Sequence, residues 1–128
     1  MEYATRNQLG NVHNPHQRGY KKVLCVCSAG LLRSPTLASV LNQELGYNTR
    51  AVGSCTSFAL IPITEALIHW ADEIIFVDKF AYHEAEREAL AEIKRLGKEV
   101  RILNIPDKYG YSEGALREAC LKQYLESA

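Results

Sequence analysis

The chain has 128 residues, enough for one domain of ordinary size, and 47% of them are hydrophobic, so it can bury a sizeable core. Lysine plus arginine and aspartate plus glutamate number 15 each, and this balance argues against a general electrostatic binder of nucleic acid. No apolar run approaches the roughly 20 residues that span a bilayer, so no membrane partner is expected.

Residues 1–20 show no sustained hydrophobic period and are expected to form a flexible arm. A single domain is expected over 21–128. The arm lacks the apolar segment of a secretory signal, so we expect a cytoplasmic protein with reduced thiols. His13 and His16 have no evident third ligand for a metal.

Four cysteines occur in the chain: Cys25, Cys27, Cys55 and Cys120. They show neither CxxC pairing nor the spacing of a zinc site. We therefore expect no metal and no cofactor. At least one of these thiols is then a candidate for a catalytic role. Cys25 and Cys120 fall on apolar stripes typical of core positions.

Strands and helices alternate along the remaining chain. Apolar runs predict strands at 22–27, 50–54, 73–77 and 99–103. Helical spacing predicts helices at about 35–45, 62–71, 79–96 and 112–125. Ser34 fits a helix N-cap, and Pro35 fits the first helical position. Short connections between these elements favour an α/β fold, with a parallel sheet between two layers of helices.

Polar side chains follow the predicted strands at Cys27, Ser54, Asp78 and Asn104. The carboxyl ends of parallel strands meet at one edge of the sheet, where such folds bind their ligands. Ser54 could wall a pocket there or simply pack over the sheet edge. Asp78 is interpreted as a cap at the end of its strand, and Asp72 as part of a turn.

The stretch from Cys27 to Ser34 joins the first strand to the first helix. Its backbone N–H groups can form a nest that binds a tetrahedral dianion, and Gly30 can adopt the positive φ that a tight loop needs. Arg33 can donate two parallel hydrogen bonds to an oxyanion. The predicted phosphate-binding residues are Ser28, Ala29, Gly30, Leu31, Leu32 and Arg33.

This arrangement suits attack of the Cys27 thiolate on phosphorus, giving a phosphocysteine that water hydrolyses. The Ser34 hydroxyl can donate a hydrogen bond to the thiolate. The backbone N–H groups and Arg33 can stabilise the negative charge of the phosphate without a metal. Asp107 is the candidate general acid, although it could instead be a turn residue that caps local backbone. Phe58 and Tyr109 are candidate pocket walls.

These residues resemble the low-molecular-weight protein tyrosine phosphatase family, in particular a short subgroup of predicted protein tyrosine phosphatases. The resemblance extends over roughly Lys22 to Leu125. The motifs that carry it are the strand Val23-Leu24-Cys25-Val26-Cys27, the Cys-x5-Arg-Ser loop with Pro35, the segment 70–78, and Ile105-Pro106-Asp107-Lys108-Tyr109. It implies a flavodoxin-like, three-layer fold with four parallel strands in the order 2-1-3-4. It also implies a metal-independent tyrosine phosphatase whose nucleophile is Cys27.

The chain departs from that family in two ways. Leu32 stands where a second cysteine often precedes the arginine, and the proline precedes Asp107 instead of following it. Two alternatives remain. The untypical acid segment keeps open a phosphate-binding module without catalysis. A thiol-based arsenate reductase can use the same loop, but it normally needs a pair of closely spaced cysteines that this chain lacks. Cys55 is a candidate redox partner of Cys27. The expected partner is a phosphorylated protein or a small phosphate ester, and a phosphorylated nucleic-acid end also fits the cradle.

Overall fold

The computed structural model describes residues 21–28, 33–54, 61–85, 87–106 and 114–127. Its sheet has β1 (Lys22–Cys27) at the centre, with β2 (Asn48–Gly53) and β3 (Glu73–Phe76) paired to it in parallel. β4 (Glu99–Ile102) extends the sheet beside β3. The order β2-β1-β3-β4 and the parallel pairing confirm the predicted fold class.

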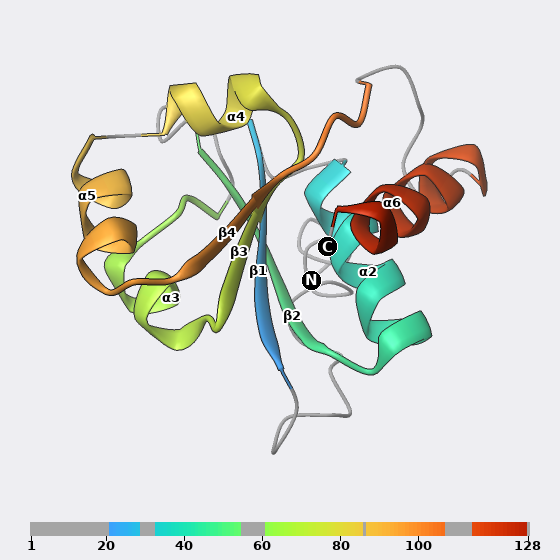
Figure 1. Ribbon diagram of the computed structural model, residues 1–128, viewed down its shortest axis with the longest axis horizontal. Coiled ribbons are helices and arrows are strands. Elements are labelled where there is room, and N and C mark those ends of the chain that lie inside the picture. Colours follow the sequence, from blue (N-terminus) through green and yellow to red (C-terminus); the bar gives the residue numbers. More distant parts are fainter. Residues whose placement is uncertain (1–20, 29–32, 55–60, 86, 107–113, 128) are drawn as a thin grey trace.

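Helices cover both faces of this sheet (Figure 1). α2 (Arg33–Leu45) and α6 (Gly114–Glu126) pack together on one face. The opposite face carries α3 (Glu65–Trp70) and α5 (Arg87–Arg95), and α4 (Lys79–Glu84) lies across the carboxyl ends of the strands. Among the helices that the structure describes, none is both long enough and apolar enough to cross a membrane.

The single helix predicted over 79–96 is wrong, because the chain breaks between α4 and α5. Ala85 has extended backbone at φ −60° and ψ 143°, and its side chain is buried. An unbroken helix of this length would extend about 27 Å. The four residues of β3 extend only about 13 Å. The bend lets Tyr82 pack edge-on against Phe76 at 5.2 Å between ring centroids, while α5 packs against α3.

α3 begins at Glu65, three residues after the start predicted at Pro62. Pro62 instead forms an isolated parallel bridge with Gly53, and the N–H of Ile63 donates to the carbonyl of Gly53. Thr64 then caps the helix by accepting from the N–H of Leu67. The helix therefore starts later than predicted because Pro62 and Ile63 pair with a distant strand residue. A local helical period cannot reveal such a pairing.

The core lies on both faces of the sheet and agrees with most of the predicted apolar stripes. Leu116, Cys120 and Tyr124 of α6 are buried, as are Leu37, Val40 and Leu41 of α2. Cys25 is fully buried in the central strand. Each fully buried large aliphatic side chain contributes about 1.5–3 kcal/mol relative to exposure.

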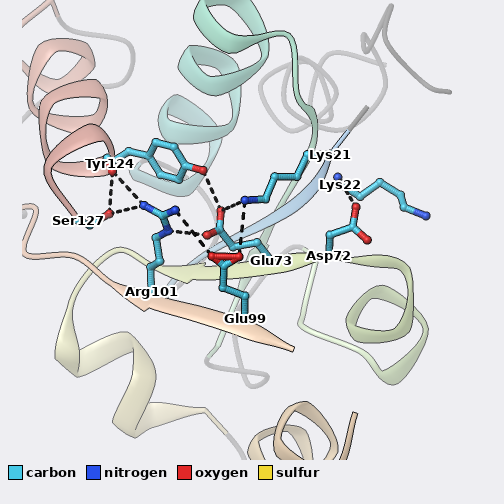
Figure 2. Close-up of polar contacts among 8 residues, drawn as sticks. All are labelled: Lys21, Lys22, Asp72, Glu73, Glu99, Arg101, Tyr124 and Ser127. Carbon is cyan, nitrogen blue, oxygen red and sulfur yellow. Dashed lines mark hydrogen bonds and ion pairs between the residues drawn. The ribbon is translucent and has the colours of Figure 1, made fainter. Parts of the chain in front are cut away.

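One carboxylate, Glu73, is fully buried at the amino end of β3 (Figure 2). It accepts from Arg101 Nε at 2.5 Å and from the Tyr124 hydroxyl at 3.0 Å, and Lys21 Nζ lies 3.5 Å away. The guanidinium of Arg101 also stacks on the Tyr124 ring, 4.4 Å from its centroid. This cluster ties β3 and β4 to α6 and to the residue before β1.

Glu73 pairs with Val23, four residues before Cys27 on β1. Four strand residues extend roughly 13 Å. The Glu73 cluster therefore lies at the opposite end of the sheet from the predicted site, and its role is in the fold.

Candidate active site

Cys27 is the last residue of the central strand, and its side chain is only 3% exposed. Its partner in the β2 pairing is Gly53. The backbone N–H of Ser54 donates to the carbonyl of Cys27 at 2.8 Å. The thiol is thus fixed at the carboxyl edge of the sheet by pairing with β2.

The hydroxyl of Ser34 lies within hydrogen-bond distance of this thiol. Its Oγ lies 3.1 Å from Cys27 Sγ and 3.2 Å from the carbonyl oxygen of Val52. When Cys27 is a thiol, S–H can donate to Ser34 while the hydroxyl donates to Val52. When Cys27 is a thiolate, the same hydroxyl can turn and donate to sulfur.

The predicted N-cap role of Ser34 differs from what the structure shows. α2 begins at Arg33, so Ser34 lies inside the first turn. Its hydroxyl bonds to the neighbouring strands instead of to the helix. The short sequence separation between a strand end and a helix start is what places this hydroxyl beside the thiol.

Arg33 is also buried, and one terminal nitrogen of its guanidinium makes two contacts. Nη1 donates to Asp78 Oδ2 at 2.6 Å and to the carbonyl of Ile105 at 2.9 Å. The other Asp78 oxygen accepts from the N–H of Ala81 at 2.8 Å and caps α4. Asp78, which was predicted to cap the end of its strand, instead caps the start of α4, and its ion pair with Arg33 was not predicted.

Glu84, the last residue of α4, is a second carboxylate at this edge that the sequence did not identify. Its Oε1 accepts from the hydroxyl of Ser28 at 2.6 Å and from that of Ser54 at 3.2 Å. The predicted helix over 79–96 placed Glu84 on a charged outer face. The break after α4 is what turns this side chain toward the strand ends.

A cavity of about 550 Å³ lies beside the Arg33–Asp78 pair, at the carboxyl ends of β3 and β4. It is lined by Asp78, Lys79, Phe80, Ile102, Leu103 and Asn104. Phe80 is 64% exposed, so an aromatic ring borders this opening. Asp78, the ion-pair partner of Arg33, therefore also lines a cavity that is large enough for a small molecule.

The buried thiols other than Cys27 have environments unsuited to nucleophilic chemistry. Burial, with a smaller contribution from Cys120 and Glu73, raises the pKa of Cys25 well above its ordinary value. Burial also raises the pKa of Cys120 to about 12. Both thiols stay protonated at neutral pH, in agreement with their predicted core positions.

Several predicted site residues fall outside the part of the chain that the structure describes: Ala29, Gly30, Leu31, Leu32, Cys55, Phe58, Asp107 and Tyr109. Their assigned roles stay predictions. Within the described ranges, no cluster of three or more histidine, cysteine or acidic side chains is placed to hold a metal ion.

The described site brings together a thiol, three hydroxyls, a guanidinium and two carboxylates, which come from β1, α2, α4 and the residues that follow β1, β2 and β3. Such a set can hold an anion and attack it with sulfur. The sequence predicts Cys27 and Asp78 at one edge of the sheet, and the pairing of β1 with β3 agrees with this. Comparisons of the chain with protein-family models, with curated proteins and with solved structures find no match.

Proposed function

We propose that this chain is a cysteine-dependent phosphomonoester hydrolase that acts through a phosphocysteine intermediate. The observation that carries the proposal is the 3.1 Å contact between Cys27 Sγ and Ser34 Oγ, next to a buried Arg33. A thiol that can be stabilised as thiolate by a hydroxyl, beside a guanidinium fixed by a carboxylate, suits attack on an oxyanion. The resemblance to low-molecular-weight protein tyrosine phosphatases supports the same reaction.

In the first step, the Cys27 thiolate attacks phosphorus, and the bond between phosphorus and the ester oxygen breaks. The leaving oxygen takes a proton from a general acid, the role predicted for Asp107. Arg33 and the backbone N–H groups of the loop stabilise the charge on the remaining oxygens.

In the second step, water attacks phosphorus, and the sulfur leaves as thiolate. The Ser34 hydroxyl donates to this departing sulfur, and the general acid, now ionised, takes the proton from water. The products are inorganic phosphate, the free alcohol or phenol, and the enzyme in its starting state.

The proposed substrate is a phosphotyrosine protein or a small phosphate ester, and we propose a cytoplasmic location. Phe80 is exposed and borders the cavity beside Asp78, and we propose that an aryl leaving group packs on this ring. The family assignment as a short tyrosine phosphatase is part of the same proposal. The sheet order β2-β1-β3-β4 is consistent with it.

The test is hydrolysis of p-nitrophenyl phosphate, phosphotyrosine peptides, small aliphatic esters and end-phosphorylated oligonucleotides, with and without tungstate. We expect turnover without added metal, inhibition by tungstate, and complete loss in Cys27→Ser. Binding of tungstate without turnover of any ester would instead identify a phosphate-binding module. Thiol-dependent reduction of arsenate in the absence of ester hydrolysis would identify an arsenate reductase.

A further inference from the structure

Three elements meet at the side chain of Glu84. The carboxylate stands at the end of α4, and its two hydroxyl donors are the residue after β1 and the residue after β2. The contacts span 56 and 30 residues of sequence. The 2.6 Å distance to Ser28 is in the range of strong hydrogen bonds between a hydroxyl and a carboxylate.

Both donors are attached to the backbone around Cys27. Ser28 follows Cys27 directly and supplies the first N–H of the predicted cradle. The N–H of Ser54 donates to the carbonyl of Cys27 at 2.8 Å. Glu84 therefore braces the peptide group that joins the nucleophile to its cradle, through one hydroxyl on each side.

The contacts also indicate how Glu84 acts. One carboxylate oxygen, Oε1, accepts from both hydroxyls, and the Ser54 hydroxyl also lies 3.5 Å from the carbonyl oxygen of Cys27. This oxygen is occupied by the protein's own donors, so its effect on a bound oxyanion passes through Ser28. A negative charge so near the cradle also repels a dianion, which a neutral acceptor of the same shape would not do.

We propose that Glu84 is a positioning residue of the Cys27 site, which holds Ser28 and Ser54 so that the cradle is formed before the oxyanion arrives. This assignment rests on the proposed function, because it supposes that an oxyanion binds beside Cys27. Preorganised donors bind and stabilise an oxyanion without reorganisation when the ligand arrives. Loss of the brace weakens both oxyanion binding and catalysis.

The test compares Glu84→Ala, which removes the acceptor, with Glu84→Gln, which keeps an acceptor oxygen and removes the charge. Tungstate affinity is measured by calorimetry, and kcat and KM are measured with p-nitrophenyl phosphate. Glu44→Ala is the matched control, since Glu44 is exposed near the far end of α2. We expect Glu84→Ala to bind tungstate about tenfold more weakly, equivalent to about 1.4 kcal/mol. Glu84→Gln should bind it at least as tightly as the native protein.

A double-mutant cycle between Glu84→Ala and Ser28→Ala measures how strongly the hydrogen bond between these two side chains contributes to tungstate binding. We expect the two losses in tungstate affinity to be strongly non-additive, because each substitution breaks the same hydrogen bond. If Glu84→Ala is too unstable to purify, Ser28→Ala alone should still weaken tungstate binding, and unchanged affinity in that variant would overturn the proposal.

Native tungstate affinity in Glu84→Ala, or equal losses in the alanine and glutamine variants, would overturn the positioning role while leaving the proposed function intact. Additive losses in the cycle would do the same. A native protein that neither binds tungstate nor hydrolyses any phosphate ester overturns the proposed function, and the role of Glu84 with it.

Discussion

The guanidinium of Arg33 and the carboxylate of Asp78 are joined at 2.6 Å although 45 residues separate them in sequence. The arginine side chain is 7% exposed and the aspartate side chain 22% exposed, so the pair is largely shielded from water. The same carboxylate begins α4 through its other oxygen. One side chain therefore orients the predicted phosphate-binding arginine and starts the helix that carries Glu84.

Replacing Asp78 by asparagine should separate these two roles. Asparagine is a good N-cap, so α4 should persist, but the guanidinium loses its counter-charge. We expect kcat/KM to fall about tenfold in Asp78→Asn, and further in Asp78→Ala, which also loses about 0.5–2 kcal/mol of capping stability.

The measurements are steady-state kinetics with p-nitrophenyl phosphate and urea unfolding. Asp72→Asn is the control, because Asp72 accepts from the N–H of Lys22 at the other end of the sheet. Native kcat/KM in Asp78→Asn would contradict a role for the pair in orienting Arg33.

Ser34→Ala should reduce kcat more than it changes KM. The hydroxyl lies 3.1 Å from Cys27 Sγ and can stabilise the sulfur when it leaves phosphorus. A hydrogen bond to a charged group contributes about 1.5–3 kcal/mol, so kcat should drop roughly 10- to 100-fold. Rapid-mixing kinetics should then show phosphocysteine accumulating after a burst of p-nitrophenol. Ser39→Ala, on the same helix, is the control, and a slow step confined to ester cleavage would argue against this role for Ser34.

Glu73→Ala should destabilise the protein without altering the site. The carboxylate is fully buried and is paired with Arg101, so its removal leaves the guanidinium with the more distant carboxylate of Glu99, at 3.7 Å. Breaking a buried pair costs up to about 3–5 kcal/mol of unfolding free energy. Tyr124→Phe, which removes one hydrogen bond to Glu73, should cost about 1–3 kcal/mol. Denaturant unfolding measures both, and a large change in kcat/KM in the folded variants would show that this cluster is coupled to the site.

Burial of Cys120 should make the protein lose stability in alkaline solution. The pKa of this thiol rises from 9.0 to about 12 on folding. The folded state therefore holds a proton that the unfolded chain releases, so the contribution is full below pH 9 and declines as pH rises toward 12. The loss is at most about 1.4 kcal/mol per pH unit from this group. Cys25, whose pKa burial also raises, acts in the same direction.

Unfolding free energies measured between pH 8 and pH 11 should fall less steeply in Cys120→Ala than in the native protein. Iodoacetamide at neutral pH should likewise leave Cys25 and Cys120 unmodified until the chain is unfolded. Equal slopes in the two proteins would show that Cys120 does not ionise on unfolding as its burial implies.

The sequence by itself determined the alternation of strands and helices, and with it the parallel sheet and its carboxyl edge. Hydrophobic patterning is a local signal: β1 is a continuous apolar run, and α6 buries Leu116, Cys120 and Tyr124 at a spacing of four residues. The pair of Cys27 and Ser34 was also predictable, because a strand end and a helix start only seven residues apart must lie close together.

Only the tertiary structure decided what surrounds that pair. The spacing of apolar residues does not reveal the break at Ala85. The break arises because α4 and α5 must both pack against a short sheet, which is a tertiary requirement. Asp78 and Glu84 reach Arg33 and Ser28 across 45 and 56 residues. The strand pattern places Asp78 at the same edge as Cys27, but no local pattern says which side chains pair there. These contacts form because the carboxyl ends of parallel strands lie at one edge of the sheet. The packing of the helices then determines which side chains come into contact at that edge.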